Sequence, residues 1–259
     1  MKELKRYLDQ RIGEYSFYFE DINSSYTYSF NERIKMPSAD CIKIHIAIAL
    51  LKKVQDNFID LYENVLIKKE DMVSGDGIIH EFDEKEYKII ELLNAMLIQN
   101  DNTAANKIID IIGMESINEV IKEMGLKDTV LKRKMMDFKS HEKGLENLTT
   151  SLDLANSLKL IYQGKYLNEE YSSIILNSLR KSQDRRKIPF YIPEKEWKCI
   201  GNKTGSLHGV ENDAAILNTK KGDFIFVVMA KTLPNNVYGI VTISRLGKMM
   251  WDIIDKSWK

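Results

Sequence analysis

The spacing of apolar residues changes along the chain, and each spacing predicts a different element. Residues 2–13 place leucine and isoleucine at every fourth position, which is typical of a short helix. Two aromatic runs at 15–23 and 26–30, separated by an Asn-Ser-Ser turn, predict a β-hairpin. The range 41–54 is too long and too apolar for a strand, so we expect a buried helix there.

Helical spacing continues through the middle of the chain, from about residue 58 to residue 185. Apolar residues recur at three and four positions, and Gly113 and Gly125 separate neighbouring segments. The helices predicted from this pattern span 86–99, 103–112, 114–124, 152–162 and 172–179.

Strand-like runs return near the C-terminus, after Pro189 and Pro193 interrupt the helical pattern. The elements predicted there are strands at 196–203, 213–219 and 223–231, followed by a helix at 240–258.

Strands at both ends of the chain, with helices between them, predict an α+β fold. We expect an antiparallel sheet of about five strands from the N- and C-terminal segments, flanked by helices, together with an all-α insertion. Residues 1–57 and 186–259 would form the sheet subdomain, and residues 58–185 the all-α subdomain.

The charge balance argues against a nucleic-acid partner. The 259 residues include 38 Lys plus Arg and 38 Asp plus Glu, so the net charge is zero and no basic footprint is present. We expect the short basic runs at 132–134 and 185–187 to be solvated loops or helix faces.

Cysteine and histidine usage indicates no metal site. Cys41 and Cys199 lie far apart, the four histidines are scattered, and neither C-x-x-C nor H-E-x-x-H occurs. A metal hydrolase is therefore unsupported. We expect two reduced thiols, and the sequence leaves a disulfide between them open.

The N-terminal sequence does not resemble a signal peptide. Residues 1–10 are charged and lack an apolar segment and a small-residue cleavage site. No stretch approaches the ~18 apolar residues of a transmembrane helix. The sequence predicts a cytoplasmic protein with no membrane partner, or a secreted one if a leader has been removed.

Three short segments carry candidate chemistry because of their order and separation. They are Asp40-Cys41-Ile42-Lys43 at the start of the buried helix, Asn100-Asp101-Asn102 before Thr-Ala-Ala-Asn, and Lys203-Thr204-Gly205 at the end of a predicted strand. The chain resembles the class A β-lactamases and penicillin-binding proteins, whose signature is S-x-x-K, S-D-N and K-T-G. The resemblance covers nearly the whole chain.

This resemblance implies a β-lactamase-like or DD-peptidase-like fold and amide hydrolysis through an acyl-enzyme. The expected substrate is a small β-lactam or a peptide ending in D-Ala-D-Ala, and no cofactor is implied. Of the three motifs, only the third, which Gly205 completes, is intact, because Asn100 replaces the serine of S-D-N.

The resemblance also assigns roles to individual residues. Lys43 would activate the nucleophile, and Asn102 would contact the amide side chain of the substrate. Lys203 and Thr204 would hold the substrate carboxylate. The backbone N–H of Ser206 would form an oxyanion hole with the N–H of the residue at the nucleophile position.

The nucleophile position itself holds a carboxylate. Counting back three residues from Lys43 gives Asp40, whereas Ser38 lies five residues away and cannot share that helix face. We expect Asp40 to be ionised and paired with a protonated Lys43, so that it cannot acylate by the family route. An aspartate is also a favoured helix N-cap, which would not restore activity.

A second departure concerns the base that releases the acyl group. If Arg133 matches the loop arginine of class A β-lactamases, Met135 occupies the position of the glutamate that activates the deacylating water. Asp137, Glu142 and Glu146 are the nearest carboxylates, and each is more typical of a solvated loop charge. A serine at position 40 would therefore acylate and then stall.

Three further residues have less specific interpretations. His45 lies on an apolar helix and is expected to be a core histidine. His208 follows the third motif and either lines the pocket or belongs to a loop. Arg245 either reaches the substrate carboxylate or forms a surface salt bridge.

Two functions remain open. The chain is either a serine hydrolase scaffold that Asp40 makes inactive, or a non-catalytic binding protein that retains an anion or peptide pocket. Retention of Lys43, Asn102 and the third motif favours the first. Loss of the serine in two of the three motifs favours the second.

Overall fold

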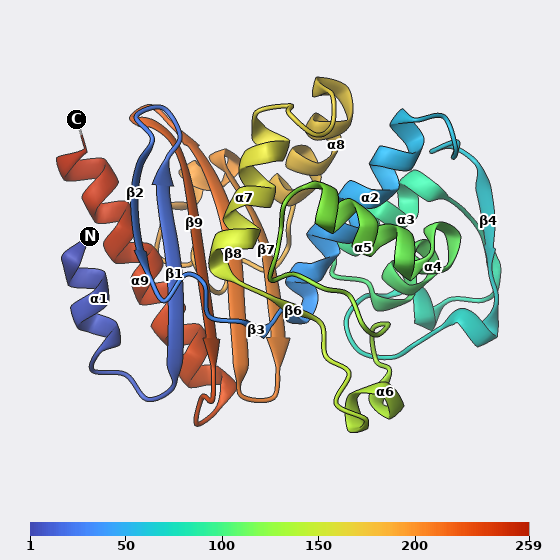
Figure 1. Cartoon of the computed structure of the whole chain (residues 1–259), viewed down its shortest axis with the longest axis horizontal. Coiled ribbons are helices and arrows are strands. Elements are labelled where there is room, and N and C mark those ends of the chain that lie inside the picture. The colour runs from blue at the N-terminus through green and yellow to red at the C-terminus, as the bar shows by residue number, and fades with distance from the viewer. Residues whose placement is uncertain (259) are drawn as a thin grey trace.

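The two ends of the chain together form one antiparallel sheet, as the computed structural model of residues 1–258 shows. The strand order is 2-1-9-8-7 in chain numbering (Figure 1). The predicted α+β class and five-stranded sheet are confirmed. The N-terminal hairpin supplies β1 (Glu14–Asp21) and β2 (Tyr26–Phe30), and the C-terminal meander supplies β7 (Ile200–Leu207), β8 (Val210–Thr219) and β9 (Gly222–Lys231).

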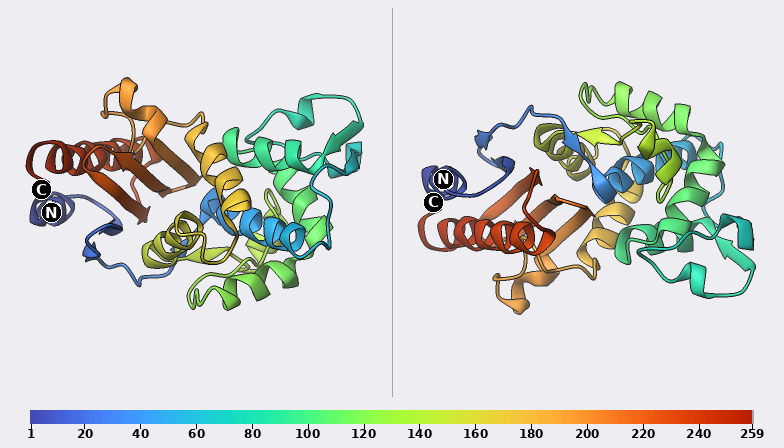
Figure 2. Two further views of the ribbon diagram at one scale, coloured as in Figure 1. Left: turned by 90° about the horizontal axis from the view of Figure 1, so that it is seen from above. Right: turned by 90° about the horizontal axis from the view of Figure 1, so that it is seen from below.

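Alternate side chains of β9 enter two different cores because successive residues of a strand face opposite sides. Phe224 and Phe226 pack on the side covered by α1 (Lys2–Leu8) and α9 (Asn236–Ser257), whereas Ile225 faces the helical half. Figures 1 and 2 show α1 and α9 side by side on one face of the sheet.

The second core continues from the other face of the sheet into the helical half of the molecule. There α7 (Ser151–Tyr162) packs on β9 and β1, and α8 (Glu169–Arg180) packs beside β7. The central helix α2 (Lys43–Gln55) is buried on all sides between residues 43 and 51, which explains its apolar sequence. The remaining helices are α3 (Ile89–Ile98), α4 (Asn102–Ile112), α5 (Met114–Glu123) and α6 (Phe138–Glu142).

The helical half is not all-α as predicted. Residues 85–88, whose C-terminal part was expected to start a helix at 86, form β5 (Lys85–Lys88), which pairs with β4 (Asn64–Ile67). Only Tyr87 is buried in β5, so this short strand has too little pattern to be recognised from the sequence. A second short pair joins β3 (Met36–Pro37) to β6 (Leu148–Thr149).

Four short 3₁₀ helices complete the described secondary structure. One of them corrects the sequence analysis, because residues 194–199 form a 3₁₀ helix and the strand expected from 196 begins only at Ile200. The 3₁₀ helices are η1 (Ala39–Ile42), η2 (Lys69–Asp71), η3 (Ile79–Glu81) and η4 (Glu194–Cys199).

Because one hydrophobic core spans the sheet face and the helices, the division into two subdomains at residues 57 and 185 stays a prediction.

Both basic runs contain a buried cation, contrary to expectation. Arg133 is 8% exposed and Lys187 is fully buried. Each pairs with a glutamate, Arg133 with Glu146 and Lys187 with Glu211, which offsets the cost of removing the charge from water.

Two simpler features concern the thiols and the helix lengths. Cys41 and Cys199 are both free thiols. Within residues 1–258, no helix combines the length and the apolar character needed to cross a membrane.

Candidate active site

The three motifs converge where η1, the loop before α4 and strand β7 meet. Asp40 lies in η1, Lys43 begins α2, and Lys203 lies on β7. Gly205 allows the close approach of η1 to β7, because a Cβ atom there would lie 2.8 Å from the Asp40 backbone nitrogen. Residues of the three motifs, which are far apart in the sequence, therefore lie close together in the structure.

Asp40 and Lys43 form an ion pair at the centre of this site. The Lys43 ammonium lies 2.9 Å from Asp40 Oδ1, and the two side chains are 0% and 13% exposed, respectively. The same ammonium donates to three oxygens: Asn100 O at 2.7 Å, Asn100 Oδ1 at 3.0 Å and Asn102 Oδ1 at 2.8 Å. The donors of this amino group are therefore engaged by oxygens of the chain.

The electrostatic surroundings keep Asp40 ionised. Burial opposes ionisation, but Lys43 and Lys203, helped by hydrogen bonds from Lys43 and Asn100, outweigh it and lower the pKa of Asp40 to about 2. Burial lowers the pKa of Lys203 to about 8, with Asp40 opposing and Lys43 adding to the shift. At neutral pH the site therefore contains one carboxylate between two ammonium groups.

Asp40 is not a helix N-cap, in contrast to the alternative raised from the sequence. The residue before η1 is Ser38, the residue before α2 is Ile42, and neither helix start has a side-chain cap. Asp40 lies in the first turn of η1 and points toward Lys43 instead.

Two backbone positions beside this ion pair are strained. Ala39 has φ 46° and Asn100 has φ 61°, a left-handed conformation that residues with a Cβ atom adopt at a cost. Each strained residue adjoins a motif, so the surrounding packing holds Asp40 and Asn100 in a fixed geometry.

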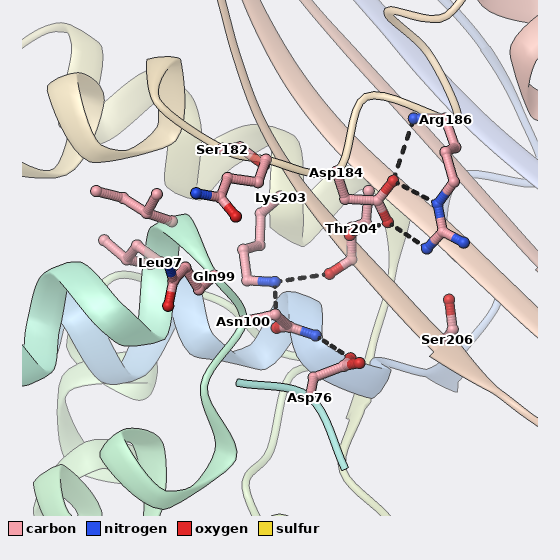
Figure 3. Close-up of a pocket in the computed structure, with 12 residues that line it drawn as sticks. Asp76, Leu97, Gln99, Asn100, Ser182, Asp184, Arg186, Lys203, Thr204 and Ser206 are labelled. Carbon is pink, nitrogen blue, oxygen red and sulfur yellow. Dashed lines mark hydrogen bonds and ion pairs between the residues drawn. The ribbon is translucent and has the colours of Figure 1, made fainter. Parts of the chain in front are cut away.

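A first cavity, here called the Lys203 pocket, has a volume of about 360 Å³ and is shown in Figure 3. Lys203 donates to Asn100 Oδ1 at 2.6 Å, and Asn100 in turn donates to Asp76 Oδ2 at 2.6 Å. On the opposite wall, the Thr204 hydroxyl donates to Asp184 Oδ2 at 3.1 Å. The Lys203 ammonium and the Thr204 hydroxyl, which are expected to hold a substrate carboxylate, are thus already hydrogen-bonded to oxygens of this chain.

Asp184 is itself fixed by an arginine. Burial opposes ionisation of Asp184, but hydrogen bonds from Arg186 outweigh it and lower the pKa of Asp184 to about 2. The guanidinium group donates from Nε at 2.9 Å and from Nη2 at 3.0 Å. This bidentate pair holds the carboxylate in place against Thr204.

A buried ion pair lies beneath Ser206. Lys187 contacts Glu211 Oε2 at 2.5 Å, and the Ser206 hydroxyl donates to the same oxygen at 2.8 Å. Lys187 also donates to the backbone oxygens of Gly205 and Asn212, both at 2.9 Å. These contacts fix the strand segment whose N–H is expected to contribute to the oxyanion hole.

A second cavity, here called the Met135 pocket, has a volume of about 500 Å³ and adjoins the first at Asp76 and Ser206. Its polar wall contains Asp40, Asp76 and Glu146. The apolar part of its lining includes Pro37, Met135, Met136, Phe138, Leu207 and Val210. A pocket of this size with apolar walls suits a small organic ligand.

Comparison with known proteins identifies this arrangement. The sequence profile of the beta-lactamase enzyme family matches residues 1–254. The chain belongs to the beta-lactamase enzyme family.

Individual relatives agree with the family match. The beta-lactamase of Proteus vulgaris is 29% identical over 221 residues, which cover 84% of this chain and 80% of that protein. Beta-lactamase BRO-1 of Moraxella catarrhalis is 27% identical over 204 residues, which cover 77% of this chain but only 64% of that protein. A beta-lactamase structure from Sphaerobacter thermophilus has a TM-score of 0.89 at 26% identity and covers 98% of this chain and 97% of that one.

Among the candidates for a deacylation base, only Glu146 lines the Met135 pocket, and it is already engaged. Its carboxylate pairs with Arg133 at 2.9 Å and contacts His141 Nδ1 at 3.0 Å. Asp137 instead accepts the backbone N–H of Ser140 and caps α6, and Glu142 is exposed at the end of that helix.

Met135 is held where its side chain faces this pocket. Asn106 accepts the Met135 N–H at 2.7 Å and donates to the Met135 carbonyl at 3.0 Å. Two hydrogen bonds thus fix the backbone of the residue that the sequence predicts at the glutamate position of class A β-lactamases.

The other residues singled out from the sequence have different places. His45 is buried, and its Nε2 lies 2.9 Å from Ser157 Oγ, as expected for a core histidine. His208 lines the Met135 pocket. Arg245 is exposed on α9 and lines neither pocket.

Sequence reasoning missed five charged residues of this site: Asp76, Asp184, Arg186, Lys187 and Glu211. Asp76 lies between Gly75 and Gly77, and these flanking glycines were the available signal. The others lie in loops or strands whose position depends on distant contacts, and no motif marks them.

Proposed function

We propose that this chain is a β-lactamase-family serine hydrolase scaffold that does not form an acyl-enzyme. Asp40 precedes Lys43 by three residues, and this spacing supports its assignment to the position of the nucleophile. The names of the relatives support β-lactams as the substrate class of the scaffold. The observation that carries the proposal is the buried 2.9 Å contact between Asp40 and Lys43.

Three physical reasons disfavour acylation. An ionised carboxylate is a weak nucleophile toward an amide, and the mixed anhydride that it would form reverts easily. Lys43 is engaged as a donor to Asp40 and to carbonyl oxygens, and so is not available as a general base. The negative charge of Asp40 also lies beside the expected oxyanion site, where it opposes the charge that develops in the transition state.

The decisive experiment compares the unaltered protein with Asp40→Ser and Asp40→Ala after incubation with benzylpenicillin and with a chromogenic cephalosporin. Intact-protein mass spectrometry should detect no adduct on the unaltered protein or on the alanine variant. The serine variant should gain one penicilloyl group. An adduct on the unaltered protein overturns the proposal, as does a folded serine variant that is never labelled.

Reversible ligand binding without turnover is the second candidate. The observation that favours it is that the two adjoining cavities, of about 360 and 500 Å³, remain open although the nucleophile is absent. Calorimetric titration of the unaltered protein with a peptidoglycan fragment distinguishes the two. Saturable binding without hydrolysis supports a binding protein. If the titration shows no heat of binding at millimolar concentrations of the fragment, the fragment is not a ligand of this protein.

A further inference from the structure

The charges that an incoming ligand meets differ between the two cavities. In the Lys203 pocket, the ammonium group of Lys203 and the hydroxyl of Thr204 are taken by Asn100 and Asp184 (Figure 3). A ligand carboxylate would have to displace an aspartate of the chain from Thr204. An anion in this pocket would therefore compete with Asp184 for Thr204 and for the guanidinium group of Arg186, which also lines it.

The Met135 pocket presents the carboxylates of Asp40 and Asp76 at its surface, and the cations that partly offset their charge lie outside its lining. Asp40 and Asp76 line it, whereas Lys43 and Lys203 do not. Lys43 is fully buried and Lys203 is 1% exposed, so both ammonium groups lie behind the wall. The one guanidinium group in the lining, that of Arg133, is engaged by Glu146.

The remaining acceptor capacity of Asp40 faces this cavity. Its Oδ1 receives the Lys43 ammonium, and an ionised carboxylate can accept about four hydrogen bonds in total. Asp76 is exposed at the junction of the two cavities and is hydrogen-bonded there by Asn100. A cationic group in this cavity would therefore be attracted by two lining carboxylates.

The rest of the lining is apolar. Met135, Met136, Phe138, Leu207 and Val210 provide surfaces that favour a hydrocarbon or aromatic body. Phe138 is 62% exposed and lies at the edge of the cavity, where a ligand would cover part of its ring.

From this combination we infer that the Met135 pocket takes an organic cation: an amine whose ammonium group contacts Asp40 and Asp76 and whose apolar body packs among the methionines. The ligand charge would thus be opposite to that of a β-lactam carboxylate. The inference rests on the proposed function in one respect, because Asp40 must remain an ionised carboxylate and not act as a nucleophile.

The test uses two probes with the same body and opposite charge, 4-phenylbutylamine and 4-phenylbutyrate, titrated calorimetrically into the unaltered full-length protein at pH 7. The amine should bind saturably, and the carboxylate should bind at least about ten-fold more weakly. Equal or tighter binding of the carboxylate overturns the inference, and so does the absence of amine binding.

Variants locate the site. Asp40→Asn should weaken amine binding by about ten-fold, and Asp76→Asn by about three-fold because Asp76 is more exposed to water. Phe138→Ala should weaken it without changing the preference for the amine. Asp252→Asn, on α9 across the sheet, is the matched control and should change nothing.

Each outcome can be separated from a failure of the proposed function. Asp76→Asn alters an exposed residue, so it tests the inference even if Asp40→Asn does not fold. Amine affinity that is unchanged in Asp76→Asn and in a folded Asp40→Asn overturns the inference. Whether Asp40→Ser acylates is measured independently by mass.

Discussion

The carboxylate of Asp40 lies 2.9 Å from the ammonium group of Lys43, within the range of a charge-assisted hydrogen bond. Both groups are largely removed from water, and Lys43 helps to keep Asp40 ionised. Asp40 and Lys43 have the sequence spacing of a nucleophile and its base. In this protein they form an ion pair instead.

This pair should make stability depend on pH in a defined window. The pKa of Asp40 is lowered from 3.8 to about 2, so its contribution is present above pH 3.8 and is lost as the pH falls through about 2. Asp40→Asn should cost about 2 kcal/mol of unfolding free energy at pH 7. Denaturant titrations of both proteins across this range measure the difference.

The exposed variant Asp83→Asn serves as the control and should show no such dependence. If Asp40→Asn lowers the free energy of unfolding by the same amount at pH 2 and at pH 7, the destabilisation comes from altered packing and not from the lost charge.

A glutamate at position 135 should restore release of the acyl group once acylation is possible. Asp40→Ser alone should accumulate a penicilloyl adduct, because Met135 cannot activate water. Adding Met135→Glu should speed the loss of that adduct by about ten-fold or more, since general base catalysis contributes at least this much. A mass-spectrometric time course follows the adduct.

Met136→Glu in the same serine background is the matched control, because Met136 lines the same pocket without the two hydrogen bonds from Asn106. Equal turnover in both double variants would show that the position of the carboxylate does not matter.

Removal of Asp184 should open the Lys203 pocket to anions. Asp184→Ala frees the Thr204 hydroxyl and deletes a negative charge from the wall. The affinity for 4-phenylbutyrate should rise by roughly ten-fold, the gain expected for one recovered charge-assisted contact. Gln183→Ala alters the same wall, and should leave the affinity unchanged. If the affinity for 4-phenylbutyrate rises equally in both variants, the effect comes from loosening of the loop and not from removal of the carboxylate.

Gly205 should be needed for the geometry of the site rather than for stability alone. A Cβ atom there would meet the backbone nitrogens of Asp40 and Cys41 at 2.8 and 3.0 Å, so that η1 must shift away from β7. In the Asp40→Ser background, Gly205→Ala should slow acylation by at least about ten-fold. Gly144→Ala strains a loop with open space around it and should leave the acylation rate unchanged.

The sequence predicted the sheet and most helices because their burial follows a simple period. Residues 224–228 alternate between two cores, and residues 43–51 are buried throughout, so both patterns are visible locally. Residues 86–88 were misassigned to a helix because one buried tyrosine gives too little pattern to distinguish a short strand.

The site was predictable only where its residues are contiguous. Residues 40–43, 100–102 and 203–205 form recognisable groups, and the structure brings all three together. The pairs Lys187–Glu211 and Asp184–Thr204 join residues about 20 or more apart in sequence, and each pairing depends on how β7 and β8 pack against the preceding loop.

The three carbonyl oxygens around Lys43 have a consequence for the history of such a site. They hold the ammonium group in addition to Asp40, so three of its contacts would remain if residue 40 were exchanged. A single exchange at position 40 would then leave the cavity and its other contacts intact, so that the scaffold could remain under selection for whatever the cavity binds.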